Sequence, residues 1–353
     1  MRRYLTFFVR RLAAAMLTLI LMITLTFILF WAIPSEPAAF VYPAAQHLTD
    51  YQISHAHHLL GTDRPLLEQY GDYLWHLLRF DFGNQWGGAQ LLENTKLVEQ
   101  AIGPQLGSAV PETLSIILGG ALLVLLLAVP LGAISGRRIG SISDRTISLV
   151  ALIGICLHPM VVGLILRTAF GNQLGWVPPT GYCPLVPNST SLCGGPADWA
   201  SHLVLPWITF ALLFLALYTR MIRATVAQTL HADYVRTARA KGVGETRVMT
   251  RHVLPNAGLR ILTMVGMEIG TAIGVCVFIE AAFGFSGLGT LAVTAMFGTV
   301  GLDLPLILAV VVVITTIVVI GNLMVDMLYA FVDPRAAVAL REKETKSLAG
   351  GVI

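Results

Sequence analysis

Long stretches without Asp, Glu, Lys or Arg alternate with charged segments along the chain. Six stretches are free of these residues, and a further one is interrupted only by Glu268. In chain order they are 12–35, 113–136, 146–166, 199–219, 261–279, 281–302 and 304–325. A helix of about 20 apolar residues crosses the ~30 Å hydrocarbon layer, because it satisfies its own backbone hydrogen bonds there. The pattern therefore predicts an all-α, polytopic membrane protein.

The segment 281–302 is the weakest of these candidates. It contains Gly284, Gly287, Gly289, Gly298 and Gly301. Each glycine in a helix costs about 1 kcal/mol relative to alanine. We therefore expect residues 283–290 to form a loop outside the membrane rather than part of a seventh span.

The distribution of basic residues also favours six spans. With six spans and a cytoplasmic N-terminus, all of the 23 Lys and Arg residues except Arg64, Arg79, Lys96 and Arg167 fall in inside segments. This asymmetry follows the positive-inside rule, whereas a seventh span would place the basic tail outside. The sequence predicts cytoplasmic N- and C-termini and a multi-pass protein of the bacterial inner membrane.

These patterns divide the chain into spans and connecting segments. The predicted spans are 12–35, 112–136, 146–168, 200–220, 259–282 and 304–328. The cytoplasmic segments include an N-terminus at 1–11, a long loop at 221–258 and a tail at 329–353. The segments on the other side are 36–111, 169–199 and 283–303.

Composition excludes several functional classes. Only 12% of the residues are charged and mean hydropathy is +0.74, whereas soluble proteins carry about 25% charged residues. The net charge of +3 is too small to favour nucleic acid as a partner. The four cysteines fit no zinc spacing, and no Gly-Lys dipeptide is present for a phosphate-binding P-loop. We expect no cofactor on this chain, so a transporter that uses ATP would bind it on another chain.

The outer segment 36–111 is too long for a simple connection. Its apolar residues between Leu66 and Leu78 recur at spacings of three and four, which predicts an amphipathic helix. His55, His57 and His58 form a tract in the same segment. Imidazoles bind transition metals, but no cysteine or carboxylate is fixed beside them. A solvated loop explains the tract equally well, so we assign no metal site.

The cytoplasmic segment 221–258 contains a helix–glycine–helix pattern. Residues 231–242 predict a helix that ends at Gly242. A second, short helix is expected from about Glu245 to Leu254, because the residue before Pro255 is disfavoured in the helical region. The basic residues here could simply anchor the segment to anionic membrane lipid. That pattern is more ordered than anchoring requires.

Two other features bear on function. Cys183 and Cys193 lie in an outer loop, where an oxidising environment favours a disulfide over two free thiols. Glu268 is the carboxylate nearest the middle of a span, where charge is costly. It either lines a translocation path or is a protonated residue at a helix interface.

Two further classes of protein remain open at this stage. Gly284-Phe-Ser286-Gly287 matches the short Gly-x-Ser-Gly motif of rhomboid-like intramembrane serine proteases. That mechanism needs a histidine within hydrogen-bond reach of the serine, and His158 and His202 are the candidates. A proton-driven secondary transporter centred on Glu268 would need no ATPase.

The cytoplasmic segment also resembles a known signature. Residues 233–242, Asp-Tyr-Val-Arg-Thr-Ala-Arg-Ala-Lys-Gly, are followed by Leu254-Pro255. This spacing is similar to the Glu-Ala-Ala…Gly…Ile-x-Leu-Pro signature of ABC importer permeases. Arg236 and Thr237 replace Glu-Ala, and Arg-Thr-Ala is usual for the first, B-type, permease subunit of dipeptide and oligopeptide importers. The residues assigned to an ATPase-coupling site are Asp233, Arg236, Ala238, Arg239, Lys241, Gly242, Glu245, Leu254 and Pro255.

The resemblance extends over nearly the whole chain and implies a specific assembly. A type I ABC importer-like fold would pair this chain with a second permease subunit as a heterodimer. Two ABC ATPase subunits, which carry ATP and Mg²⁺, would bind on the cytoplasmic side, and an extracytoplasmic binding protein would deliver short peptides. The basic face of 231–242 would meet acidic groups of the ATPase, and Asp233 and Glu245 would meet basic ones.

Two departures from the family pattern affect the cargo more than the mechanism. Leu157-His158-Pro159-Met160 replaces the usual Leu-Pro-Ser-Phe, and the segment between Cys183 and Cys193 is an insertion. His158 is therefore placed, with Glu268, beside the expected translocation path. Nickel chelate, haem or glutathione remain alternative cargoes.

Overall fold

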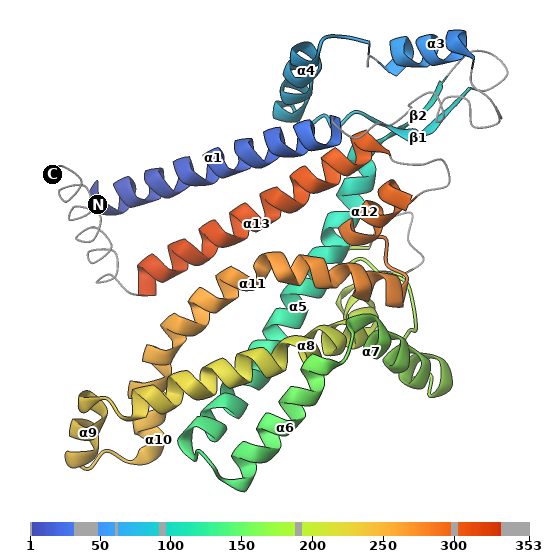
Figure 1. The fold of residues 1–353 in the computed structure, drawn as a ribbon. Helices are drawn as coiled ribbons and strands as arrows, with labels where there is room; N and C mark the ends of the chain where they lie inside the picture. The colour runs from blue at the N-terminus through green and yellow to red at the C-terminus, as the bar shows by residue number, and fades with distance from the viewer. Residues whose placement is uncertain are drawn as a thin grey trace. The chain divides into compact units, whose positions relative to one another are not determined.

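The computed structural model describes residues 2–31, 49–60, 63–91, 97–187, 193–297 and 303–332. Five helices are long and apolar enough to cross a membrane. They are α1 (Arg2–Trp31), α5 (Ile102–Arg137), α8 (Pro196–Leu230), α11 (Leu254–Phe283) and α13 (Leu304–Val332). A sixth candidate is a bent pair of shorter helices. Helices dominate the chain (Figure 1), which agrees with the predicted class.

The sixth candidate span is broken in the middle. The predicted span 146–168 corresponds to α6 (Ile142–Cys156) and α7 (Pro159–Leu166), which are bent by more than 40° relative to each other. The π-helical turn η1 (Arg167–Gln173) continues α7. Proline pushes the residue before it out of the helical region, and His158 has ψ 135° at this point. Its Nδ1 accepts a hydrogen bond from the Met160 N–H at 3.3 Å and so caps α7.

The outer segment contains two helices and a small hairpin. These are α3 (Asp50–Leu60), α4 (Leu66–Leu78), β1 (Asn84–Leu91) and β2 (Leu97–Ala101). The apolar spacing correctly indicated α4. The antiparallel β1–β2 pairing was not predicted, because β1 contains two adjacent glycines and its register is irregular between Gln85 and Gln90. Period-2 alternation is absent, and long-range pairing alone makes these residues strands.

Helix ends differ from the predicted span ends. Helix α5 begins ten residues before the predicted start at 112, and α8 continues to Leu230 rather than 220. A charge-free stretch marks the part of a helix that fits hydrocarbon, whereas the helix itself continues into the interface. Parts of the predicted segments 36–111, 283–303 and 329–353 lie outside the described residues, namely 36–48, 298–302 and 333–353.

The described helices belong to two compact units. The first comprises Met1–Met16, Ile116–Phe283 and Val318–Ile353. Within it α8 packs against α6, α7 and α11. Small residues allow the close approach: a Cβ added to Gly136 of α5 would lie 2.7 Å from the carbonyl oxygen of Arg223, and one on Gly154 of α6 would lie 2.7 Å from that of Leu212. Close backbone packing of this kind is typical of membrane helices.

The second unit comprises Leu17–Ser115 and Gly284–Ile317. Its core is formed by buried residues of α5, α12 (Leu288–Phe297) and α13. The loop expected at 283–290 is shorter than predicted, because α12 already begins at Leu288. Side chains of α5 satisfy the start of α12: Glu112 accepts from the Ser286 N–H at 2.8 Å, and Thr113 accepts from the Leu288 N–H at 2.9 Å. Tertiary contact thus supplies the cap that the local sequence lacks.

Candidate functional site

The cytoplasmic connection between α8 and α11 is a folded element. After α8 ends, α9 (Asp233–Ala240), α10 (Glu245–Val248) and the π-helical turn η2 (Met249–Val253) follow in direct succession. Figure 1 shows α9 and α10 together beyond the ends of α8 and α11. The helix–glycine–helix pattern expected in the cytoplasmic segment 221–258 is therefore present, and the segment is almost entirely helical.

A Schellman motif ends α9. The Gly242 N–H donates to the Arg239 carbonyl at 2.9 Å, and the Val243 N–H donates to the Ala238 carbonyl at 3.2 Å. Gly242 has φ +78°, a left-handed conformation that L-residues with a Cβ rarely adopt. The glycine stops α9 as the sequence predicted, and it also sets the direction in which the chain enters α10.

One face of α9 is buried and the other is exposed. Val235 and Ala238 are buried on α9, as are Val248 of α10 and Val253 of η2. The exposed residues on the opposite face and its end are Asp233, Tyr234, Arg236, Thr237, Arg239, Ala240 and Lys241. Most of the predicted coupling residues lie on the exposed side, whereas Ala238 belongs to the packed side. The pattern is that of a short amphipathic helix held against its own chain.

Arg239 and Glu245 differ from what was expected of them. They were expected to meet charges of a partner, but they pair with each other: Arg239 Nε lies 2.7 Å from Glu245 Oε1, and Nη2 lies 3.2 Å from Oε2. The hydrogen bonds from Arg239 hold the pKa of Glu245 below its usual value. The two residues are six apart and flank the glycine turn, so the bidentate pair links the ends of the turn.

The connection is also tied to the spans that flank it. Arg260 Nη1 near the start of α11 donates to Gln228 Oε1 near the end of α8 at 2.6 Å. Leu254 and Pro255 were predicted to end the second short helix. In the structure they instead form the first turn of α11. Proline is tolerated there because the first N–H groups of a helix have no partner within it. The Arg260–Gln228 bond thus holds the end of α8 beside the start of α11.

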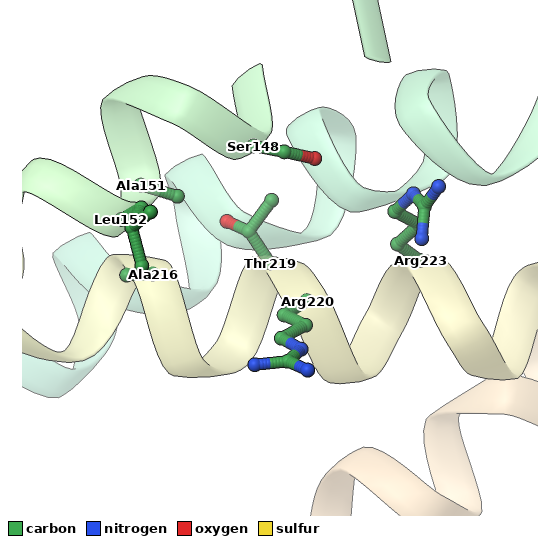
Figure 2. Close-up of a pocket in the computed structure, with 7 residues that line it drawn as sticks. All are labelled: Ser148, Ala151, Leu152, Ala216, Thr219, Arg220 and Arg223. Carbon is green, nitrogen blue, oxygen red and sulfur yellow. The ribbon is translucent and has the colours of Figure 1, made fainter. Parts of the chain in front are cut away.

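An ion pair further along α8 was not predicted from the sequence. The Asp144 side chain is only 4% exposed, and its Oδ2 accepts from Arg223 Nη2 at 2.8 Å (Figure 2 shows Arg223 on α8). Asp144 also accepts from Ser135 Oγ and, at 2.8 Å, from the Gly140 N–H. The pair joins the α5–α6 turn to α8. The sequence offered one indication of this ion pair, because Asp144 is the single acidic residue among the basic residues of segment 137–145.

The acidic residues of the spans have different environments. Asp326 on α13 forms an ion pair with Arg11 on α1 at 3.1 Å. Glu280 is fully buried, and Glu268 is partly exposed. His158 is exposed, and its ring meets Phe278 edge-on with 4.7 Å between centroids. Glu268 and His158 thus occupy separate local environments.

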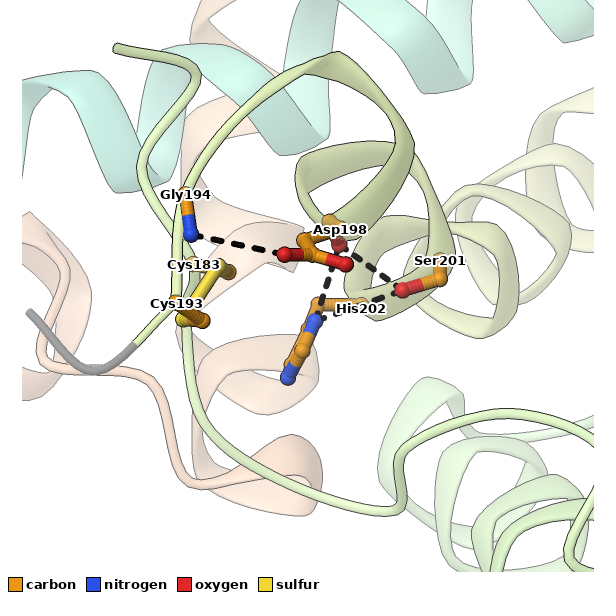
Figure 3. Close-up of a disulfide and its surroundings, with 6 residues drawn as sticks. All are labelled: Cys183, Cys193, Gly194, Asp198, Ser201 and His202. Atoms are coloured by element: carbon orange, nitrogen blue, oxygen red, sulfur yellow. Dashed lines mark hydrogen bonds between the residues drawn. A yellow bond between two sulfur atoms is a disulfide. The ribbon is translucent and has the colours of Figure 1, made fainter. Parts of the chain in front are cut away.

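The outer loop before α8 is closed by a disulfide between Cys183 and Cys193, with 5.8 Å between the Cα atoms (Figure 3). The loop leads directly into the first turn of α8. There Asp198 accepts from the Gly194 N–H at 3.5 Å, and the Asp198 carbonyl accepts from Ser201 and His202. The covalent link therefore holds the chain where it enters the membrane-spanning helix.

The remaining candidate chemistry does not assemble in the described part of the chain. No group of three or more His, Cys, Asp or Glu side chains there could hold a metal ion. In the histidine tract, His58 Nδ1 is instead 3.2 Å from Asp63 Oδ2. The Nδ1 atoms of the two candidate protease histidines interact with the backbone of Met160 and Asp198.

Comparisons with known proteins place this arrangement in context. Residues 128–338 match the family described as binding-protein-dependent transport system inner membrane component. Residues 4–89 match the N-terminal region described for membrane components of such systems. Together the two matches include nearly all the candidate spans and the whole α9–α10 connection.

Related proteins and structures give the same picture. A probable peptide ABC transporter permease protein of Sinorhizobium fredii is 31% identical over 331 residues, which are 93% of this chain and 98% of the relative. An oligopeptide transport system permease protein of Bacillus subtilis is 33% identical over 316 residues, covering 88% of this chain and 92% of the relative. An inward-facing structure of the MetNI methionine ABC transporter matches 65% of this chain and 96% of its own, with TM-score 0.50 and 16% identity. This last similarity concerns the fold alone.

Proposed function

This chain belongs to the family of binding-protein-dependent transport system inner membrane components, and we propose that it is the B-type permease subunit of an ABC importer for short peptides. As a membrane component it is not a protease, so Ser286 has no catalytic role. Peptide cargo is supported by the names of the relatives in Sinorhizobium and Bacillus.

The observation that carries the proposal is the construction of α9. A short helix with an exposed face is joined to α10 by a Schellman turn and by the Arg239–Glu245 pair, and the two flanking spans are joined to each other by the Arg260–Gln228 hydrogen bond. Such an element resists local deformation, so a force applied to its exposed face reaches α8 and α11. Rigid-body movement of packed helices around a fixed site is the usual physical basis of alternating access.

The proposed partners follow from the surfaces of the molecule. The exposed face of α9, with Tyr234 and Arg236, would seat in a groove of an ABC ATPase, and a second ATPase would bind a related permease subunit that forms a heterodimer with this chain. ATP and Mg²⁺ would bind to the ATPases, and this chain would need no cofactor. The binding protein would approach the outer segments that contain α3, α4 and the disulfide loop.

Within this assembly the coupling residues have two different roles. Arg236, Lys241 and Tyr234 are exposed and would contact the ATPase. Arg239, Gly242 and Glu245 would maintain the turn through their contacts with one another. Because the Arg239–Glu245 pair is internal, reversal of one charge should first disturb the turn and only then the docking.

Cysteine crosslinking tests the docking surface. Tyr234→Cys on α9 should crosslink to a co-purified ATPase chain in the assembled transporter, and transport-competent ATP hydrolysis should decrease when the link forms. Ile142→Cys is a matched control, because Ile142 is an exposed residue at the start of α6 rather than on α9. Crosslinks from Tyr234→Cys to lipid alone, or equal crosslinking from both positions, would contradict the proposal.

The glycine turn tests coupling separately from docking. Gly242→Asn should retain most peptide uptake, since asparagine tolerates the left-handed conformation, whereas Gly242→Val should lose it. Space is not the cause, because a Cβ at this position would meet no atom within 4 Å. Equal amounts of each variant in the membrane, measured by immunoblot, are the required control. Equal uptake by the two variants would exclude the coupling role.

Uptake by whole cells tests the cargo. Radiolabelled di- and oligopeptides should accumulate only with the intact chain and its binding protein. Uptake should survive an uncoupler when ATP is maintained. Competition by nickel chelate, haem or glutathione at lower concentrations than any peptide would assign one of those cargoes instead. Uptake that stops with the uncoupler but survives ATP depletion would favour the proton-driven alternative centred on Glu268.

A further inference from the structure

A pocket of about 220 Å³ lies between α6 and α8 in the first unit. Ser148, Ala151 and Leu152 line it from α6, and Ala216, Thr219, Arg220 and Arg223 line it from α8. Figure 2 shows Ser148 and Thr219 in the space between the two helices, with Arg223 toward one end. The residues assigned above to coupling, the disulfide and the metal-free histidine tract do not contribute to it.

The lining changes from apolar to cationic along the membrane normal. With the cytoplasmic N-terminus that the positive-inside rule predicts, α8 runs inward and α6 runs outward. Ala216 and Leu152 then lie farther from the cytoplasm than Arg220, Arg223 and Ser148. Arg220 is the first charged residue after the uncharged stretch 199–219. The cationic end is therefore at the inner interface, and the apolar end faces hydrocarbon.

The charges of the pocket do not cancel. The Asp144 carboxylate neutralises Arg223, whereas Arg220 has no hydrogen-bond or ion-pair partner among the described residues. One positive charge therefore remains. A guanidinium at the edge of hydrocarbon is costly unless an anion or water solvates it.

Thr219 supplies a second, independent observation. Its side chain is 3% exposed, and its hydroxyl has no hydrogen-bond partner in the described part of the chain. Other threonines of the spans donate to the carbonyl four residues earlier, as Thr209 does to Leu205. A buried hydroxyl without a partner is unfavourable by about 1–3 kcal/mol by itself, and an acceptor oxygen in the pocket would satisfy it.

We propose that this pocket binds the phosphodiester headgroup of an anionic phospholipid of the inner leaflet. The headgroup would accept hydrogen bonds from the hydroxyls of Ser148 and Thr219, and an acyl chain would extend past Ala216 and Leu152. The Arg220 guanidinium, which is directed away from these hydroxyls in Figure 2, would turn toward the bound phosphate. The single negative charge of a phosphodiester matches the single uncompensated charge of the pocket. The pocket, at about 220 Å³, has room for a headgroup but not for a whole lipid.

Native mass spectrometry of the detergent-purified transporter that contains the full chain tests this site. Phosphatidylglycerol is titrated against phosphatidylcholine with the same acyl chains. Arg220→Gln should weaken phosphatidylglycerol binding by about tenfold, since a charge-assisted hydrogen bond is lost. Leu152→Trp should weaken it as well by filling the pocket. Arg138→Gln is the matched control, because it removes an exposed cation from the neighbouring cytoplasmic turn.

Several outcomes would overturn the proposal. Equal loss with Arg138→Gln would show general attraction to the basic surface. Unchanged binding in both pocket variants would place the lipid elsewhere. Displacement of the lipid by glycerol 3-phosphate at similar concentration would identify a site for free phosphate esters. If Leu152→Trp released the second permease subunit without changing the lipid count, the pocket would be a subunit interface. The melting temperature of each variant controls for misfolding.

Discussion

Replacement of Asp144 by asparagine removes the negative charge from the buried junction of α5, α6 and α8. The carboxylate accepts from Arg223, Ser135 and the Gly140 backbone, and its side chain is 4% exposed. Asparagine has nearly the same size, so the change leaves no cavity. It leaves Arg223 with no full negative charge to neutralise it, and one oxygen acceptor becomes a donor that faces other donors.

The expected cost can be estimated from the exposure of the two partners. Removing one partner of a buried ion pair costs about 3–5 kcal/mol. The Arg223 side chain is 30% exposed and can therefore recover some hydration. We expect a loss near the lower limit, about 3 kcal/mol. Glu245→Gln, which breaks an exposed Arg–carboxylate pair of similar geometry, should leave stability almost unchanged.

Reversible unfolding of the purified chain in mixed micelles, titrated with SDS, measures both variants. The double variant Asp144→Asn/Arg223→Gln removes both charges and should be less unstable than the sum of the two single changes, because residues in contact are not additive. Additive effects, or a loss for Asp144→Asn no larger than for Glu245→Gln, would refute a stabilising ion pair at this junction.

Other contacts lead to three further predictions. Gly154→Val should prevent α6 from packing against α8, because a Cβ would lie 2.7 Å from a backbone carbonyl oxygen. A lower amount of protein recovered from the membrane, at an unchanged mRNA level, would show this packing defect. Cys183 and Cys193 are ten residues apart, so reducing their disulfide or replacing both with serine should lower the free energy of unfolding by ~3 kcal/mol in the chain-entropy account. Alkylation of free thiols without reductant, followed by mass measurement, should find neither cysteine modified. The Gly83 N–H holds the pKa of Asp81 below its usual value, so its turn gains stability above about pH 4 and loses it as pH falls through the lowered pKa. The protection factor of the Gly83 N–H, which is its exchange rate relative to the intrinsic rate at the same pH, should decrease only in strong acid, and a decrease near pH 6 would contradict the assignment.

Local sequence information identified the elements whose cause is local. The charge-free stretches correspond to helices because hydrocarbon demands an internally bonded backbone. Gly242 ends α9 because its conformation requires no Cβ. The resemblance in residues 233–255 pointed to the correct family for the same reason: a helix, a glycine turn and a following proline are all encoded within a short segment.

The three-dimensional arrangement decided the features that depend on distant residues. The break at His158 was visible as a proline, but the direction of α7 depends on packing against α8 and α11. The capping of α12 by α5 comes from groups 174 residues apart in the chain, and the irregular register of the β1–β2 hairpin is likewise set by pairing between strands. No period in the sequence reports such pairings, because each requires the fold before it can form.

The amino-acid sequence by itself determined that this protein is a helical, multi-pass inner-membrane component with a helix–glycine–helix element on the cytoplasmic side. Transfer of apolar residues to hydrocarbon and the conformational freedom of glycine are properties of the residues themselves. Only the tertiary structure decided that Arg239 meets Glu245, that Asp144 meets Arg223 and that Arg220 remains without a counter-ion among the described residues. Charges are counted in a sequence, but their partners are chosen by the packing of helices that bring distant positions within a few ångströms.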